Sequence, residues 1–266
     1  LVVGNPIDHS LSPLLHNLWI KENNIKSIYD SQKLNIKDLE KLIISIKEGK
    51  ISGANITVPF KKDIISFLDE LSPEAKDTQS VNTVYFKDNK SIGHNTDIIG
   101  FKKSIEDTKF NIADKKILIL GAGGVVPSII YALKKMKASQ IMISNRTKSN
   151  ADNLKKLFKN LDILRWGELP DFDMIINATS LGLNEKDTIN LDFSNIKKGK
   201  FFYDVIYNPA GTNFLSNARK LGHETANGKK MFIYQAASAF EIWHGIKPRI
   251  DEKIFELLNK WLELEF

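Results

Sequence analysis

Four short segments in the first hundred residues carry side chains suited to binding a polar ligand and to moving a proton. They are Ser10-Leu11-Ser12, Asn55-Ile56-Thr57 with Lys61 after it, Asn82-Thr83, and Asn95-Thr96-Asp97. Hydroxyls and amides can hydrogen-bond a ligand, and a lysine ammonium or an aspartate can exchange a proton with it. Each group also has a purely structural interpretation. Ser12 could cap a helix, and Asn55 and Thr57 could lie on the solvated face of a strand.

A glycine-rich turn, Gly121-Ala122-Gly123-Gly124, lies between an apolar run and a helical pattern. This order of strand, turn and helix is the context in which a dinucleotide pyrophosphate binds. Gly121 would allow the tight turn, Gly123 would let the phosphates approach, and the helix N-terminus would supply free N–H donors. The third position of the fingerprint is Val126 instead of Gly or Ala, which weakens the match. The alternative is a glycine turn in an ordinary α/β protein.

The next expected strand, residues 140–144, is followed by Asn145-Arg146-Thr147. An acidic residue at this point would bind the ribose 2′-hydroxyl of NAD(H), whereas an arginine suits the 2′-phosphate of NADP(H). The sequence therefore predicts NADP(H) as the cofactor. The alternative is that Arg146 only ends a strand at the protein surface.

Two sets of alternating strand and helix patterns would position these groups. In the first set we expect strands over 1–4, 27–33, 53–58, 81–86 and 91–94, and helices over 14–22, 36–47, 62–71 and 73–78. Ser12 should cap the first of these helices, and Ile36, Leu39, Ile43 and Ile46 should form the buried face of the second. In the second set we expect strands over 117–120, 140–144, 174–178 and 202–207, helices over 125–136 and 148–158, and closing helices over 232–244 and 251–264.

The strands of the second set are continuously apolar, which is typical of a parallel sheet covered on both faces. We therefore predict an α/β protein with two domains. Residues 1–97 plus 233–266 would form an N-terminal αβα substrate domain. Residues 98–232 would form a Rossmann-like, doubly wound NADP-binding domain, with the active site in a cleft between the two.

The composition excludes several other classes of site. Cysteine is absent from the 266 residues, so disulfide scaffolds, thiolate metal sites and cysteine nucleophiles are excluded. The five histidines show no metal-binding spacing, and we expect no metal. The net charge is +6, but the lysines occur as scattered pairs, which favours a solvated surface over a nucleic-acid face. No apolar run reaches membrane-spanning length, and we expect a cytoplasmic protein without membrane contact.

Nine motifs together resemble a known family. They are His9-Ser10-Leu11-Ser12-Pro13, Asn55-Ile56-Thr57-Val58-Pro59-Phe60-Lys61, Ser80-Val81-Asn82-Thr83, Asn95-Thr96-Asp97, Gly121-Ala122-Gly123-Gly124, Asn145-Arg146-Thr147, Asn177-Ala178-Thr179-Ser180, Asp204-Val205-Ile206-Tyr207-Asn208-Pro209 and Gln235-Ala236-Ala237. In these motifs and their order the chain resembles the shikimate dehydrogenase family. The resemblance spans residues 9–237.

The resemblance implies a reversible, NADPH-dependent reduction of 3-dehydroshikimate to shikimate in the chorismate pathway to aromatic amino acids. It implies that Lys61 and Asp97 are the catalytic pair. The implied substrate contacts are Ser10, Ser12, Asn55, Thr57, Lys61, Asn82, Asp97, Tyr207 and Gln235. The serines, Thr57 and Tyr207 would hold the substrate carboxylate. The implied cofactor contacts are Gly121, Ala122, Gly123, Gly124, Val125, Val126, Asn145, Arg146, Thr147, Thr179, Val205 and Gly228.

The residue types fit this chemistry independently. Hydride addition to a ketone builds negative charge on the carbonyl oxygen, so the reaction needs an acid that stabilises and protonates the developing alkoxide. An ammonium beside a carboxylate serves this purpose without a metal. Hydroxyls and amides suit a polyol acid, because a buried polar group that loses its hydrogen bond costs about 1 to 3 kcal/mol.

Two features depart from the family pattern. Asn150 stands where a second basic residue often occurs, and Val125-Val126 replaces the small pair that usually follows the glycines. An NAD-dependent quinate/shikimate dehydrogenase is one alternative, but it would show an acidic residue where Asn145 stands. Other relatives with a similar two-domain layout act on folates or on glutamyl-tRNA, and the latter need a cysteine nucleophile, which this chain lacks. A non-catalytic, NADP-binding regulatory paralogue is the last alternative, and loss of Lys61 or Asp97 would have indicated it. We expect a monomer or homodimer.

Overall fold

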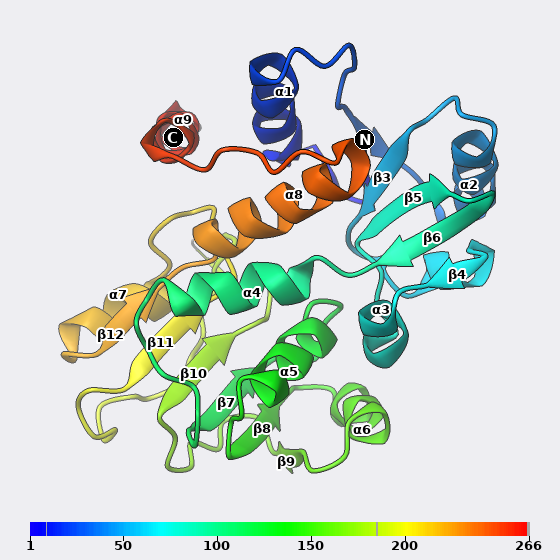
Figure 1. Ribbon diagram of the computed structural model, residues 1–266. Helices are drawn as coiled ribbons and strands as arrows, with labels where there is room; N and C mark the ends of the chain where they lie inside the picture. The colour runs from blue at the N-terminus through cyan, green and yellow to red at the C-terminus, as the bar shows by residue number, and fades with distance from the viewer. Residues whose placement is uncertain (9, 185, 265–266) are drawn as a thin grey trace. The chain divides into compact units, whose positions relative to one another are not determined.

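The computed structural model describes residues 1–8, 10–184 and 186–264, and the chain divides into two compact units (Figure 1). Unit 1 contains Leu1–Gly100 and the C-terminal stretch from Ile233, and unit 2 contains Phe101–Phe232. His9, which opens the first motif, lies outside the described residues.

Unit 1 is built on a six-stranded mixed sheet in the order β2-β1-β3-β5-β6-β4. The strands are β1 (Val2–Gly4), β2 (Ser31–Lys33), β3 (Gly53–Ile56), β4 (Glu70–Leu71), β5 (Thr83–Lys87) and β6 (Lys90–His94). β1 pairs in parallel with β2 and β3, and β5 runs antiparallel to β3 and β6. The helices are α1 (Ser12–Glu22), α2 (Leu39–Lys47), α3 (Pro73–Thr78) and α9 (Glu252–Leu264), together with the part of α8 (Lys229–His244) from Ile233.

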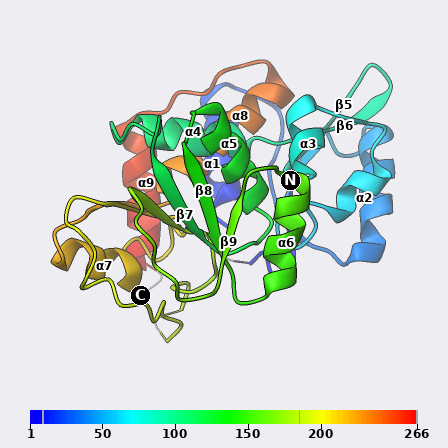
Figure 2. The same cartoon turned by 90° about the horizontal axis from the view of Figure 1, so that it is seen from below.

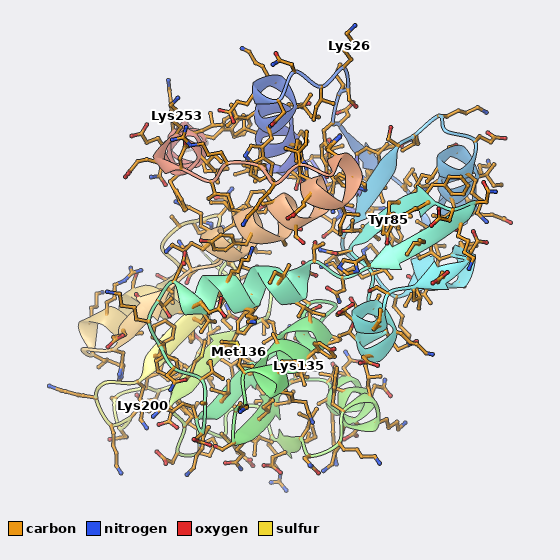
Figure 3. The ribbon with its side chains drawn as sticks, in the orientation of Figure 1. Lys26, Tyr85, Lys135, Met136, Lys200 and Lys253 are labelled. Atoms are coloured by element: carbon orange, nitrogen blue, oxygen red, sulfur yellow. The ribbon has the colours of Figure 1, made fainter. Side chains whose placement is uncertain are left out.

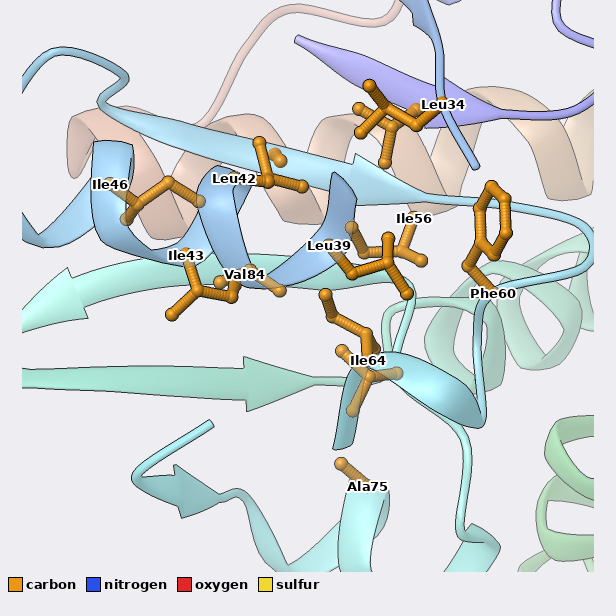
Figure 4. Packing of buried hydrophobic residues seen from close by; sticks show 13 residues of the cluster. Leu34, Leu39, Leu42, Ile43, Ile46, Ile56, Phe60, Ile64, Ala75 and Val84 are labelled. Atoms are coloured by element: carbon orange, nitrogen blue, oxygen red, sulfur yellow. The ribbon is translucent and has the colours of Figure 1, made fainter. Parts of the chain in front are cut away.

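Helix α2 shows how the sequence pattern fixes the core of unit 1. Leu39, Leu42, Ile43 and Ile46 recur at helical spacing and are all buried. Figure 4 shows Leu39 near Ile56 and Ile43 near Val84 of the sheet, and all of these residues belong to one buried cluster. Ile36, which we expected on the same face, is 57% exposed, because residues 36–38 form a separate 3₁₀ turn.

The helix expected over residues 62–71 is wrong. The segment forms a 3₁₀ helix, Asp63–Phe67, and then strand β4, which pairs with β6. The side chain of Asp69 accepts hydrogen bonds from the backbone N–H and hydroxyl of Ser91, at 2.8 and 2.7 Å. These contacts with a strand distant in sequence outweigh local helical propensity. The strand expected over 27–33 is likewise limited to β2.

The C-terminal residues complete the core of unit 1. Trp243 Nε1 donates to the backbone oxygen of Val84, at 3.1 Å, and its ring covers Gly53. Trp19, which is fully buried, packs edge-on against Phe240 and donates from Nε1 to the backbone oxygen of Arg249, at 3.0 Å. The first hundred residues therefore do not form this core alone.

Unit 2 contains a six-stranded, fully parallel sheet in the order β12-β11-β10-β7-β8-β9. The strands are β7 (Lys116–Leu120), β8 (Gln140–Ser144), β9 (Asp162–Leu164), β10 (Met174–Asn177), β11 (Phe201–Asp204) and β12 (Glu224–Ala226). The helices are α5 (Val126–Lys135), α6 (Lys148–Leu157) and α7 (Asn213–Lys220), and α4 (Asp97–Glu106) leads into the unit. Figure 2 shows β7, β8 and β9 side by side. This strand order confirms the Rossmann-like, doubly wound fold.

Exposed lysines occur on separate elements of both units. Figure 3 labels Lys26, Lys135 and Lys253, and each of them is exposed on a different part of the chain. Among the described residues, no helix is both long and apolar enough to span a membrane.

Candidate active site

Unit 1 contains a sheltered ion pair between Lys61 and Asp97. The two charged groups approach to 2.5 Å between Nζ and Oδ2, and the side chains are 12% and 8% exposed. Lys61 follows the buried Phe60, and its backbone oxygen accepts from the N–H of Val81 at 2.8 Å. Asp97 is the first residue of α4. Both charges are thus fixed by backbone that is anchored in the core, yet each keeps some access to solvent.

Asn82 connects this pair to Gln235 of α8. The Nδ2 atom of Asn82 lies 3.0 Å from Asp97 Oδ1 and 3.4 Å from Gln235 Oε1. Its Oδ1 atom accepts from the backbone N–H of Thr96 at 2.7 Å, which fixes the orientation of the amide. Lys61, Asn82, Asp97 and Gln235 therefore meet, although 174 positions separate the first from the last.

Asn55 lies behind this group, on β3, and is 6% exposed. Its Oδ1 atom accepts from the hydroxyl of Tyr29 at 2.6 Å. Its Nδ2 atom donates to the backbone oxygen of Asn82 at 3.0 Å and to Thr83 Oγ1 at 3.1 Å. The amide of Asn55 thus holds Asn82, which contacts Asp97, and its neighbour Thr83 in place.

Ser10, Ser12 and Thr57 follow the carboxyl ends of the adjacent parallel strands β1 and β3. Ser12 is not the cap of α1 that we expected: it is the first helical residue, and Leu11 is the capping residue. The hydroxyl oxygen of Ser10 instead accepts from the N–H of Ser12, at 3.3 Å. The Thr57 N–H donates to the backbone oxygen of Val3 at 2.9 Å, which ties the two strand ends together.

Tyr207 is the one candidate substrate residue that unit 2 carries. It lies after β11 and stacks on Phe232, with ring centroids 4.5 Å apart.

The glycine turn after β7 has the shape that a dinucleotide requires. Gly121 has a φ of +110°, and a Cβ there would lie 2.7 Å from the backbone oxygen of Ala178. Gly123 and Gly124 are exposed, and α5 begins two residues later. Val126 is fully buried, so the larger side chain at the third fingerprint position is accommodated in the core. The turn leaves backbone and a helix N-terminus open to a pyrophosphate.

Asn145, Arg146 and Thr147 follow β8 and precede α6. The Nδ2 atom of Asn145 donates to the backbone oxygen of Thr147, at 2.8 Å, which closes the turn. The Arg146 side chain is exposed. Its guanidinium can therefore reach a phosphate group in solution or on a ligand.

Gly228 lies against the segment that follows β11. A Cβ at this position would overlap the backbone oxygen of Val205, and the Gly228 N–H donates to the backbone oxygen of Ile206 at 3.1 Å. Thr179 follows β10, and its hydroxyl donates to Asn177 Oδ1 at 2.7 Å. The turn at Gly121 and the residues Thr179, Val205 and Gly228 therefore all surround the carboxyl ends of β7, β10 and β11.

Sequence reasoning assigned no role to Asn177 and Asp204, which are the last residues of β10 and β11. Both are fully buried, and Asn177 Nδ2 donates to Asp204 Oδ1 at 3.0 Å. Burial raises the pKa of Asp204 to about 6, against the opposing effect of hydrogen bonds from Thr212, Ile206 and Asn177. The available signal was a polar residue at the end of each of two apolar strands.

Within residues 1–8, 10–184 and 186–264, no group of three or more histidine, aspartate or glutamate side chains could hold a metal ion.

Comparisons with known proteins give a consistent result. Three family models match: the shikimate dehydrogenase substrate binding domain over residues 2–84, shikimate/quinate 5-dehydrogenase over 103–204, and the shikimate 5′-dehydrogenase C-terminal domain over 230–252. A shikimate dehydrogenase (NADP⁺) of Pelagibacter ubique is 60% identical over 259 residues, which cover 97% of this chain and 98% of the relative.

Two solved structures are also similar. Shikimate dehydrogenase from Aquifex aeolicus is 36% identical, with a TM-score of 0.86, over 93% of this chain and 92% of that one. Shikimate 5-dehydrogenase from Thermus thermophilus, in complex with NADP(H) and shikimate, is 28% identical, with a TM-score of 0.85, over 93% and 94% of the two chains.

Proposed function

Because the chain belongs to the shikimate dehydrogenase family, we propose that Lys61 and Asp97 transfer the proton in its NADP-dependent, reversible reduction of 3-dehydroshikimate to shikimate. The observation that carries this proposal is the sheltered ion pair of Lys61 and Asp97, with Asn82 and Gln235 beside it. These are the groups that a polyhydroxylated ketone needs: a proton donor, and hydrogen-bond partners for neighbouring hydroxyls.

Lys61 acts as the acid in the reduction. NADPH, when bound, supplies the hydride for the carbonyl carbon. The carbonyl oxygen then gains negative charge, which the ammonium of Lys61 stabilises and neutralises by giving up one proton. In the reverse direction neutral Lys61 takes the proton of the hydroxyl. Asp97 holds Lys61 in position and accepts a hydrogen bond from a hydroxyl of the substrate.

The remaining substrate contacts are assigned by their place in the fold. Ser10, Ser12 and Thr57 bind the carboxylate from the ends of β1 and β3, and Tyr207 assists them. Asn82 and Gln235 bind ring hydroxyls. Asn55 belongs to the same site and acts by holding Asn82 and Thr83, as its hydrogen bonds to both residues support.

The NADP(H) contacts lie at the carboxyl edge of the sheet in unit 2. Gly121, Ala122, Gly123, Gly124, Val125 and Val126 receive the pyrophosphate, and Asn145, Arg146 and Thr147 receive the 2′-phosphoryl ribose. Thr179, Val205 and Gly228 contact the nicotinamide half. The positive φ of Gly121 supports this arrangement, as does the close backbone packing of Ala178 on Gly121 and of Val205 on Gly228, which a Cβ would prevent.

We place the substrate domain at residues 1–97 plus 233–266 and the NADP-binding domain at 98–232, which the division into two compact units supports. The protein acts in the cytoplasm, as a monomer or homodimer, on small molecules and not on nucleic acid. Lysines exposed on separate elements support the last point.

The test measures nicotinamide absorbance while shikimate or quinate is oxidised with NADP⁺ or with NAD⁺. Turnover of shikimate with a preference for NADP⁺ is the expected result. Turnover of quinate with NAD⁺ alone would overturn the roles given to Arg146 and to the ring-hydroxyl contacts. No turnover in any mixture, with NADPH still bound, would identify a non-catalytic paralogue.

A further inference from the structure

The ends of β10 and β11 carry a polar pair that the reaction itself does not use. Asn177 and Asp204 are opposite each other in the parallel register of the two strands, and both are fully buried. Taking a carboxylate out of water costs several kcal/mol unless hydrogen bonds compensate for the lost hydration. A pair of apolar residues would fill the same space without that cost, so the pair has a task beyond packing.

Asp204 uses both carboxylate oxygens to hold the segment that follows β11. Its Oδ1 atom accepts from the backbone N–H of Ile206 at 3.0 Å and from Asn177 Nδ2 at 3.0 Å. Its Oδ2 atom accepts from the hydroxyl of Thr212 at 2.6 Å. Thr212 is also the capping residue of α7. A single side chain therefore joins the strand end, the next two residues and the following helix.

Asn177 holds the segment that follows β10 in the same way. Its Oδ1 atom accepts from the backbone N–H of Thr179 at 3.0 Å and from the Thr179 hydroxyl at 2.7 Å. Its Nδ2 atom donates to the backbone oxygen of Leu181 at 3.1 Å as well as to Asp204. The two segments are thereby locked to each other through one amide and one carboxylate.

The locked segments are those that carry Thr179 and Val205. Their backbone also packs closely against two glycines of the proposed cofactor site: the oxygen of Ala178 faces Gly121, and the oxygen of Val205 faces Gly228. In the strand order β11-β10-β7-β8, the 2′-phosphoryl ribose would lie toward β8, because its proposed contacts Asn145, Arg146 and Thr147 follow that strand. The segments after β10 and β11 therefore border the other, nicotinamide half.

From this geometry we infer that Asn177, Asp204 and Thr212 are positioning residues that pre-form the nicotinamide half of the NADP(H) site before the cofactor binds. The inference rests on the proposed cofactor contacts of Thr179 and Val205. All three positioning residues are buried, so they would act by fixing the backbone that contacts the cofactor. A pre-formed site avoids the ordering cost that binding would otherwise carry.

The experiment compares Thr212→Val with Thr212→Ser, because valine keeps the shape of threonine and removes the hydroxyl, whereas serine keeps the hydroxyl. Three quantities are measured: kcat/KM for NADPH, KM for 3-dehydroshikimate, and the Kd of 2′,5′-ADP, which carries only the adenosine half of the cofactor. Thr212→Val should lower kcat/KM for NADPH about tenfold, since a hydrogen bond to a charged group is lost. It should leave the Kd of 2′,5′-ADP within about twofold of the unmodified enzyme. Thr212→Ser should behave like the unmodified enzyme.

The inference is overturned if Thr212→Val matches Thr212→Ser, or if 2′,5′-ADP binding weakens by the same factor as NADPH use. The unmodified enzyme provides a second measurement that needs no folded variant. In the absence of cofactor, the N–H groups of Thr179 and Ile206 should exchange with D₂O far more slowly than exposed amides; exchange at the rate of exposed amides overturns the inference. Absence of shikimate oxidation by the unmodified enzyme would instead contradict the proposed function, which separates the two failures.

Discussion

The two units carry buried carboxylates of opposite design. Asp97 in unit 1 faces an ammonium, and its side chain is 8% exposed, whereas Asp204 in unit 2 is fully buried and accepts hydrogen bonds from three neutral donors, Asn177, Ile206 and Thr212. Under the proposed function, the charge beside Asp97 changes during the reaction, because the ammonium of Lys61 gives up a proton. Asp204 instead holds the segment that follows β11 in place through its hydrogen bonds to Ile206 and Thr212. Under the proposed function, side chains perform the chemistry in unit 1, and backbone shape forms the cofactor site in unit 2.

The largest effect is expected from removing the ammonium of unit 1. Lys61→Ala should lower kcat about 1000-fold, since a positioned general acid contributes about 100- to 10,000-fold. The KM for shikimate should change far less, because most substrate contacts remain. Lys62→Ala is the matched control, as its side chain is exposed beside Lys61. Near-normal turnover of Lys61→Ala in steady-state kinetics would show that another group is the acid.

The carboxylate of unit 2 should be visible in the pH dependence of stability. The pKa of Asp204 is raised from 3.8 to about 6 by burial, so the folded state binds its proton more tightly than the unfolded chain does. The bound proton contributes about 3 kcal/mol to the free energy of unfolding below about pH 4. This contribution is lost as pH rises through about 6. Asp204→Asn should remove that slope from urea-unfolding free energies measured between pH 4 and 8. Parallel curves for the two proteins would contradict the assignment.

Asp69 provides the contrasting control in unit 1. Hydrogen bonds from Lys47 and Ser91 lower the pKa of this exposed carboxyl, so its contribution to stability is present above about pH 4 and lost as pH falls. The unfolding free energy of Asp69→Asn should therefore fall less than that of the unmodified protein as pH decreases below about 4.

The backbone of the cofactor turn should tolerate little change. Gly121→Ala should raise the KM for NADPH about thirtyfold, because the alanine would be strained at positive φ and would collide with the oxygen of Ala178. Gly199→Ala is the control, since Gly199 also has a positive φ but has open space around it. Equal effects of the two substitutions on NADPH binding would mean that strain alone, and not the shape of the turn, is responsible.

The smallest effect concerns the choice of cofactor. Arg146→Ala should weaken NADP⁺ binding about tenfold and leave NAD⁺ binding unchanged, since only NADP⁺ carries the 2′-phosphate. The exposed neighbour Lys148 provides the control as Lys148→Ala. Isothermal titration with both cofactors measures the difference. A similar loss for NAD⁺ would place Arg146 outside the phosphate site.

The doubly wound sheet of unit 2 could be predicted because its central strands are apolar throughout and alternate with helices. The edge strands β9 and β12 could not, since each has three residues and no buried run. Helix α7 had a readable signal in Thr212 followed by Phe214, Leu215 and Ala218, which are buried at helical spacing. Neither α7 nor α4 was predicted; the start of α4 coincides with the expected domain boundary near residue 97.

The sequence shows which residues could serve the site but not which of them meet. The approach of Lys61 to Asp97 depends on where the turn after β3 and the start of α4 lie, and these positions are fixed by β3, β5 and β6. The pairing of Asn177 with Asp204 depends on β10 and β11 being neighbours in exact register, which no local pattern specifies.

The division of the chain has a consequence for the order of events during protein synthesis. Unit 2 is continuous in sequence, but the core of unit 1 needs Phe240 and Trp243 to cover Trp19 and Gly53. A ribosome releases the chain from its N-terminus, and domains generally fold as units. We therefore expect the nucleotide-binding half, which is second in the sequence, to be the first to fold. The first hundred residues would remain without a complete core until the last helices are synthesised. During that time their tryptophan and leucine side chains would be exposed to solvent and to chaperones.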